Sequence, residues 1–430
     1  MTSHIVVRHR RVNATAIART GERRHELDWL RVLVIIGLIP FHVLGLFAIA
    51  MTHYLTSGQP NQLAVLVSNF FILWPMSLLF LVAGASTWFA LGRRTPRQYT
   101  RERILRLFVP FLFATLVLIP IQVFAVVRAY SQVIDLNLIP SAGLRGDESF
   151  LEFYPPYLAG YAYFLTHFSS MGETVFWGHI WFVPRLLLYA LATLPLLLWL
   201  RSSPGMRLID RIADIFVVPG TTLLLGVAIA LPRVLAALGY RTAIQITGEA
   251  NWDIYNQWAQ LGVFMMCFLL GYIFYASPRL LQAIRRDGTV ALTLGIISFA
   301  LLQTPLGHFA SVTEATPGGV LIAWLRAESE WLLVAGVLSV GLRYFTFASG
   351  LLAYLNDAAY PLYVLHMPVV IVVGLMVIQM HLPTVATLLL VVVGALAGTL
   401  GLYEYVIKRV NVLRLLFALK PARATGVTTV

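Results

Sequence analysis

The sequence predicts an all-α integral membrane protein with about ten transmembrane helices and with both termini in the cytoplasm. Of its 430 residues, 59% are hydrophobic and only 12% are charged, whereas a soluble protein is roughly a quarter charged. The apolar residues form runs of about 20, the length that crosses a ~30 Å hydrocarbon core. They lack the apolar and polar alternation of β-barrel strands. We therefore expect helical spans.

The spans follow from the apolar runs and from the arginines between them. The predicted spans are residues 29–52, 63–91, 104–128, 179–200, 214–238, 257–276, 289–307, 319–342, 354–379 and 384–408. Most of the 31 lysines and arginines fall in alternate gaps between these spans. Basic residues concentrate on the cytoplasmic side of a membrane protein, so this pattern puts both termini inside, in the cytoplasm.

Three segments flank or interrupt the spans. Residues 1–25 form a basic tail without the apolar stretch of a signal peptide, and residues 412–430 form a second cytoplasmic tail. The membrane domain is residues 26–411. The one long connection, about 129–178, is predicted to be extracytoplasmic and is rich in aromatic residues and carboxylates. Any chemistry must be built between the helices and this loop.

Composition also excludes some classes of protein. The net charge of +12 is explained by the topology, and no basic groove with interleaved aromatic residues is present, so nucleic acid is not an expected partner. The single cysteine, Cys267, lies in an apolar run, which leaves no disulfide framework. No permanently bound cofactor or metal is expected.

The first predicted span contains ionisable residues that lipid does not tolerate. Asp28, Arg31 and His42 fall on one stripe of a helix. His42 lies roughly 16 Å along the axis from Arg31, near the middle of the membrane. Such a group normally faces a cavity and has a function, and histidine can act there as a base or a nucleophile. The structural alternative is a neutral histidine hydrogen-bonded to a neighbouring helix.

A second basic pair enters the third span from the cytoplasm. Arg103 and Arg106 lie three residues apart in "RERILRLF", and in an α-helix they share a face. Two guanidinium groups fixed by one helix suit a phosphate, which they can bind bidentately. The alternative is a topology signal that also contacts lipid headgroups.

Two later motifs carry further candidate residues. In "YLNDAAYPLYVLHMP" (residues 354–368), Pro361 should free a backbone carbonyl, with Tyr360 and His366 close to it. In "HIWFVPRLLLY" (residues 179–189), His179 and Trp181 could close over an external ligand. An interfacial belt of aromatic residues is the alternative explanation for both motifs.

One more charged group lies in the eighth predicted span. In "WLRAESEWLL", Arg326 and Glu330 are four residues apart and are expected to form an ion pair along the helix.

Together these motifs resemble acyltransferase family 3, a family of membrane proteins. The resemblance rests on Arg31 and His42, separated by ten residues, on Arg103 and Arg106, and on the late "YPLYVLH". The segments "FLEFYP", "HIWFV" and "YLNDAAYPLYVLH" look most like the branch of the family that contains glucan biosynthesis protein C. The resemblance extends from about residue 25 to residue 410.

The resemblance implies an O-acyltransferase in the bacterial cytoplasmic (inner) membrane. It would take an acyl group, acetyl or succinyl, from cytoplasmic acyl-CoA and deliver it to a hydroxyl of an extracytoplasmic carbohydrate. Acyl-CoA would be the co-substrate, with its phosphates on Arg103 and Arg106. His42 would be the base or the acyl carrier, aided by Arg31 and Asp28. His179, Trp181, Tyr360 and His366 would contact substrate.

Two other classes of function remain possible from the residues alone. A proton-coupled transporter could use His42 and His366 as a proton relay, although the arginines gather at one inner-face site, which suits an anionic donor better. A receptor or assembly protein could bind partners through the outer loop, but that function would leave His42 and the arginine pair without a role.

Overall fold

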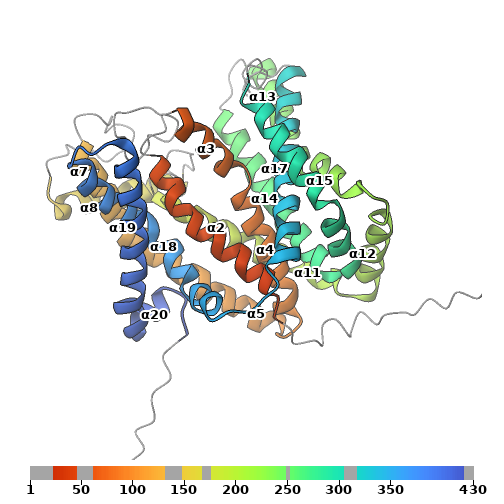
Figure 1. Cartoon of the computed structure of the whole chain (residues 1–430), viewed down its shortest axis with the longest axis horizontal. Helices are drawn as coiled ribbons and strands as arrows, with labels where there is room; N and C mark the ends of the chain where they lie inside the picture. The colour runs from red at the N-terminus through yellow and green to blue at the C-terminus, as the bar shows by residue number, and fades with distance from the viewer. Residues whose placement is uncertain are drawn as a thin grey trace, which may run out of the picture.

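The computed structural model describes residues 23–45, 62–130, 148–166, 176–247, 252–304 and 317–420. Within these ranges the chain is helical and contains no strand (Figure 1). One group of helices comprises α2 (His25–Leu44), α7 (Ile119–Tyr130), α18 (Gly350–Ile378) and α19 (Thr384–Tyr405). A second comprises α13 (Leu225–Thr247), α15 (Pro278–Leu302) and α17 (Pro317–Tyr344). Between the two groups, α4 (Pro75–Leu91) packs against α14 (Trp252–Ala276).

Shorter elements connect these helices. They are α3 (Gln62–Leu73), α5 (Pro96–Arg103), η2 (Ile104–Phe108), α6 (Val109–Phe113), η3 (Ala114–Leu118), α8 (Phe150–Thr166), η6 (Gly178–Trp181), α10 (Phe182–Ala192), α11 (Leu194–Leu200), α12 (Ser203–Ile215), η7 (Thr221–Leu224), η8 (Ile407–Arg409) and α20 (Asn411–Leu416). Figure 1 shows α5 and α20 at one end of the bundle and α3 and α13 at the other. The described part of the predicted outer loop, residues 129–178, is mainly the helix α8.

Fewer spans are apparent in the structure than the sequence predicts. Among the described residues, seven helices are long and apolar enough to cross a membrane, and the pair α10 and α11, bent by 53°, makes up to eight. Helices α15 and α17 have 25 and 28 residues, but each carries a cluster of charged side chains near or within its apolar stretch. Ten spans and cytoplasmic termini therefore stay predictions. Residues 46–52 of the first predicted span lie outside the described residues.

The third span is not a regular α-helix. Two π-helical turns interrupt it, at η2 and η3, and each is followed by a proline in the next helical segment, Pro110 and Pro120. Proline has no N–H, so Pro120 cannot donate a helical hydrogen bond to the Leu116 carbonyl four residues earlier. That carbonyl instead accepts a hydrogen bond from the Tyr154 hydroxyl of α8 at 2.9 Å. Helix α8 is therefore held against this span by a hydrogen bond that the proline makes available.

Backbone contact joins the two central helices. A Cβ atom on Gly84 of α4 would lie 1.8 Å from the Phe268 carbonyl oxygen of α14, and one on Gly271 would lie 1.9 Å from the Leu81 carbonyl oxygen. No other residue fits at either position. Close packing through small residues is the usual way in which membrane helices associate, and it fixes the face of α4 that Leu79, Val82 and Ser86 present to the cavity described below.

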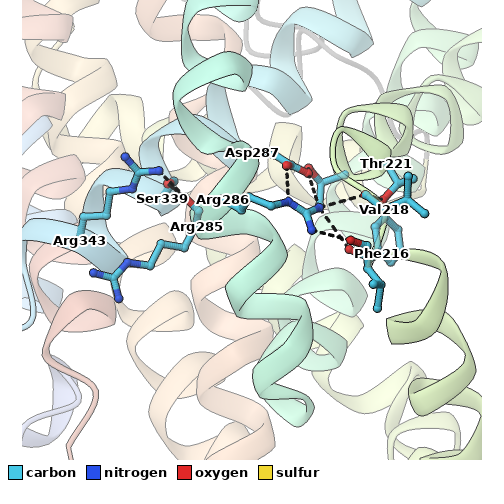
Figure 2. Close-up of polar contacts among 10 residues, drawn as sticks. Phe216, Val218, Thr221, Arg285, Arg286, Asp287, Ser339 and Arg343 are labelled. Atoms are coloured by element: carbon cyan, nitrogen blue, oxygen red, sulfur yellow. Dashed lines mark hydrogen bonds and ion pairs between the residues drawn. The ribbon is translucent and has the colours of Figure 1, made fainter.

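Two arginines of α15 attach the amphipathic helix α12 and the residues after it to the bundle. Arg279 pairs with Asp210 and Asp214 of α12 at 3.0 and 2.6 Å, and Arg286 binds the residues that follow α12 (Figure 2). Arg286 of α15 donates to the carbonyls of Phe216, Val217 and Val218, which follow α12, at 2.7–3.2 Å. It also pairs with the buried Asp287 at 2.7 Å. Burial raises the pKa of Asp287, but hydrogen bonds from Arg286 and from Thr222 outweigh burial and hold the pKa below its usual value. The residues after α12 are thereby bound to the start of α15.

Replacing Arg286 should therefore destabilise the fold. Arg286→Gln removes the donors for the carbonyls after α12 and leaves Asp287 without its cation, and we expect a loss of about 1–2 kcal/mol in stability. Thermal unfolding in detergent measures it. The matched control is Arg285→Gln, because the Arg285 side chain is exposed and donates no hydrogen bond in the structure. Because the pKa of Asp287 is lowered in the folded protein, its ion pair with Arg286 stabilises the fold fully above the unfolded pKa of about 4. It is lost as the pH falls through the folded pKa. Equal melting temperatures for the two variants at neutral pH would contradict this account.

Candidate functional site

A cavity of about 650 Å³ lies between α2, α4, η2, α10 and α18 and is closed on one side by the chain after α19. Its cationic lining consists of Arg31, Arg103, Arg106, Lys408, Arg414 and Lys420. Asp357 is the one carboxylate residue among the lining residues. Six cations facing one carboxylate favour an anionic occupant. Residues 412–420, predicted to belong to a tail, take part in this cavity.

Arg31 is held in the cavity wall by two neighbours. Its guanidinium pairs with Asp28 at 2.6 Å, one turn earlier on α2, and donates to the Asn356 side-chain carbonyl of α18. Asp28 also accepts from Arg23 at 2.6 Å. The prediction that Asp28 and Arg31 lie together on the first span is confirmed, and Asn356 is a partner that no sequence spacing indicated.

Arg103 and Arg106 lie where α5 passes into the π-turn η2. The sequence prediction assumed a regular α-helix here, whereas the structure has a π-turn over Ile104–Phe108. Both nevertheless line the cavity, and both also line an adjoining hollow of about 230 Å³ with Arg93 and Arg94. Arg103 lies over the Tyr99 ring at 4.9 Å. Glu102 also lines the hollow and pairs with Arg94 and Arg106. This corner of the protein thus has two cation-rich spaces that share Arg103 and Arg106.

The far end of the cavity is aromatic and apolar. Phe182, Val183 and Leu186 of α10 face Tyr360 and Tyr363 of α18 there. The Tyr360 hydroxyl is buried and has no hydrogen-bond partner among the described residues. From Arg31 and Asn356 toward Tyr363, the lining of the cavity therefore changes from cationic to apolar.

Three histidines meet immediately beyond Tyr363. The His366 ring centroid lies 5.2 Å from that of His42 and 4.9 Å from that of His179, and 5.9 Å from the Tyr363 ring. His42 comes from α2, His179 from η6 and His366 from α18. Three residues that are remote in the sequence thus form one cluster in the protein interior, and within the described residues they do not form a metal site.

The prolines of α18 explain how His179 is held. Pro368 has no N–H for the Val364 carbonyl four residues earlier, and His179 Nε2 donates to that carbonyl at 2.9 Å. The Tyr363 hydroxyl in turn donates to the His179 carbonyl at 2.6 Å. This reciprocal pair of hydrogen bonds fixes η6 on α18. The sequence motif pointed to Pro361, but Pro368 is the proline whose freed carbonyl holds the site.

The remaining predicted residues lie elsewhere. Trp181 contacts Arg185, whose guanidinium lies 4.7 Å from its ring, and stacks on Phe264 at 5.5 Å, and it does not line the cavity. The predicted ion pair between Arg326 and Glu330 is wrong. Glu330 is 1% exposed and pairs with Arg233 of α13 at 2.6 Å, because its side chain faces the neighbouring helix and not along its own.

Comparison with known proteins agrees with the resemblance seen in the sequence. The family model of the acyltransferase domain matches residues 24–404, so the chain belongs to acyltransferase family 3. No curated protein and no solved structure matched the chain. With its apolar helices, the protein is thus a multi-pass membrane acyltransferase that uses an acyl donor.

The hydrogen bond from Tyr363 to His179 can be tested by its effect on stability. Tyr363→Phe removes the hydroxyl that donates to the His179 carbonyl, and we expect a loss of about 1 kcal/mol. Tyr360→Phe is the matched control one turn away, since the Tyr360 hydroxyl has no partner among the described residues, and it should leave stability unchanged. Thermal unfolding of both variants decides the question. A Tyr363→Phe protein as stable as the control would show that the bond does not hold the cluster.

Proposed function

We propose that the protein is an O-acyltransferase that moves an acetyl or succinyl group from cytoplasmic acyl-CoA to a hydroxyl of an extracytoplasmic glycan. The observation that carries the proposal is the cavity itself: six cations lie at one part, aromatic side chains follow, and three histidines lie immediately beyond. CoA has the same order of chemistry, with phosphates at one end and an acyl thioester at the other. The sequence likeness to the glucan branch makes a glucan the first acceptor to test.

The cations would bind the phosphates of the donor. Arg103 and Arg106 line both cationic spaces, so one donor could place its phosphates in the two spaces at once. Guanidinium groups bind phosphate bidentately. Arg31, fixed by Asp28 and Asn356, stands on the helix that also carries His42 and would orient the donor toward it. Tyr360 would donate its free hydroxyl to the acyl or pantetheine part of the donor.

His42 would carry out the transfer, by one of two routes. As a base, it takes the proton of the acceptor hydroxyl while the oxygen attacks the thioester carbonyl carbon. The C–O bond forms, the C–S bond breaks, and the thiolate leaves and receives the proton. As a nucleophile, its nitrogen first forms an acyl-imidazole with release of the thiolate, and the acceptor oxygen then attacks that intermediate. Both routes need one imidazole nitrogen without a proton.

The geometry also fits the proposed orientation. With ten spans and both termini inside, the cationic part of the cavity faces the cytoplasm, where acyl-CoA is found. His42, eleven residues along α2 from Arg31, is about 16 Å deeper at 1.5 Å per residue. We propose the bacterial cytoplasmic membrane as its location, which the likeness to the glucan branch of the family implies.

The first experiment is donor binding by the purified protein in detergent, with acetyl-CoA, succinyl-CoA and free CoA compared. Arg103→Ala combined with Arg106→Ala should weaken binding at least about 10-fold, because each charge-assisted hydrogen bond contributes ~1.5–3 kcal/mol. The matched control is Arg97→Ala combined with Arg101→Ala, which removes the same charge from exposed positions that line neither cationic space.

If both double variants weakened donor binding equally, the overall positive charge of this face and not specific contacts with Arg103 and Arg106 would attract the donor. A folded wild-type protein that binds none of the three compounds would contradict the proposal and favour the transporter.

Replacing the first-span histidine should separate chemistry from binding. His42→Ala should reduce transfer to a glucan acceptor by about 10²-fold or more, while donor binding and thermal stability stay close to those of the wild type. Transfer is measured with radiolabelled acyl-CoA in proteoliposomes. Retained transfer would remove His42 from the mechanism, and lost binding would make its role structural.

A further inference from the structure

Two of the three clustered histidines are locked in a single tautomer. A carbonyl oxygen only accepts hydrogen bonds, so the ring nitrogen facing it must carry the proton. His366 Nδ1 donates to the Tyr363 carbonyl at 2.7 Å, and His179 Nε2 donates to the Val364 carbonyl at 2.9 Å. Nε2 of His366 and Nδ1 of His179 therefore carry no proton and can only accept hydrogen bonds. Each is buried and has no partner among the described residues.

A buried hydrogen-bond acceptor without a donor costs stability. Such an acceptor in a native protein therefore calls for a functional explanation. His366 is 1% exposed and His179 is 7% exposed, which leaves few groups that could supply the missing proton. His42 is the member of the cluster that no hydrogen bond holds in the described structure, and it is only half-buried. It is the one ring of the three that can turn to offer an N–H.

The ring geometry distinguishes the two neighbours of His366. Its ring and that of His42 are tilted by 36° with centroids 5.2 Å apart. An in-line N–H···N bond of about 2.9 Å between two imidazoles places the centroids about 5.1 Å apart, because each nitrogen lies about 1.1 Å from its ring centre. The bond is not made in the structure, but rotation of the His42 ring could form it with little change in the centroid distance. The His179 ring instead stands at 82° to that of His366, at 4.9 Å. That edge-to-face contact fixes the plane of the His366 ring.

We propose that His366 is a positioning residue whose Nε2 accepts the N–H of His42, so that the other nitrogen of His42 is held without a proton toward the reacting groups. This inference rests on the proposed function for the identity of the reaction. The Tyr363 carbonyl sets the tautomer of His366, and the edge-to-face contact with His179 sets the plane of its ring. His366 in turn sets the tautomer and the ring orientation of His42. A histidine with one nitrogen tied in this way presents a single, fixed base or nucleophile.

The same contact balances the protons on both routes. When His42 acts as a base, the proton of the acceptor hydroxyl moves to its bare nitrogen, and the resulting imidazolium shares its other proton with His366 until the thiolate is protonated. When His42 is acylated, a C–N bond forms and the C–S bond breaks. The acyl-imidazolium keeps its N–H hydrogen bond to Nε2 of His366 while the thiolate departs. When the acceptor oxygen then attacks the acyl carbon, the C–N bond breaks and the hydroxyl proton passes to the thiolate.

Two conservative variants of His366 separate positioning from packing. The amide of glutamine reaches the position of Nε2 and can accept from His42, whereas that of asparagine reaches only Nδ1 and can keep the bond to the Tyr363 carbonyl. We expect His366→Asn to lower kcat about 100-fold with the donor KM unchanged, and His366→Gln to lose less than about 10-fold. His381→Asn, at an exposed turn after α18, should have wild-type kcat.

A second measurement does not depend on acyl transfer. In protein with ¹⁵N-labelled histidine in lipid nanodiscs, the His42 signals, assigned by their loss in His42→Ala, should show one protonated and one bare nitrogen in the wild type and in His366→Gln. In His366→Asn the two tautomers should mix. The same His42 spectrum in wild type and His366→Asn, or equal kcat in the Gln and Asn variants, would overturn the inference. If the wild type shows the fixed tautomer but transfers no acyl group, the proposed function fails and the positioning role stands.

Discussion

A backbone carbonyl inside a membrane has no water to donate to it, and the site depends on how one such group is satisfied. Pro368 leaves the Val364 carbonyl of α18 without its helical donor, and His179 is the side chain that donates to it. Because the Tyr363 hydroxyl returns a hydrogen bond to the His179 backbone, the start of α10 is bound to α18 at two points. The apolar end of the cavity, formed by α10 and α18, and the histidine cluster both follow from that junction.

Electrostatics governs the other end of the cavity. Like charges held together repel one another, and the cost is greatest where the surroundings are poor in water. Six cations line one space of about 650 Å³, and among the described residues Asp28, Glu102 and Glu404 form ion pairs with three of them, Arg31, Arg106 and Lys408. A protein retains such an arrangement where a ligand supplies the missing negative charge. The cation cluster is therefore better explained by an anion that enters the cavity than by topology alone.

Sequence spacing was a good guide where the relevant contacts lie within one helix. The stripe of Asp28, Arg31 and His42 depends only on helical geometry, and the structure has Asp28 paired with Arg31. Contacts between helices were not predictable in this way. Nothing in the sequence around Asn356 or Pro368 indicated their roles. Glu330 has Arg326 four residues before it in the same helix, but it pairs with Arg233 of another helix. Which neighbour a side chain faces is decided by the packing of two helices, and no single-helix period encodes it.

The π-turns explain why the sequence could identify the arginine pair but could not predict the backbone conformation that carries it. The sequence places Arg103 and Arg106 next to Pro110, and the missing N–H of that proline relaxes the α-helical hydrogen bonding just before it, at η2. An α-helical reading puts both guanidinium groups on one face, and in the structure both border the same two adjoining spaces. A ligand with a single phosphate would need only one of these spaces. A ligand with several phosphates along its length would contact both, so the lining of both spaces by Arg103 and Arg106 agrees with the donor proposed above.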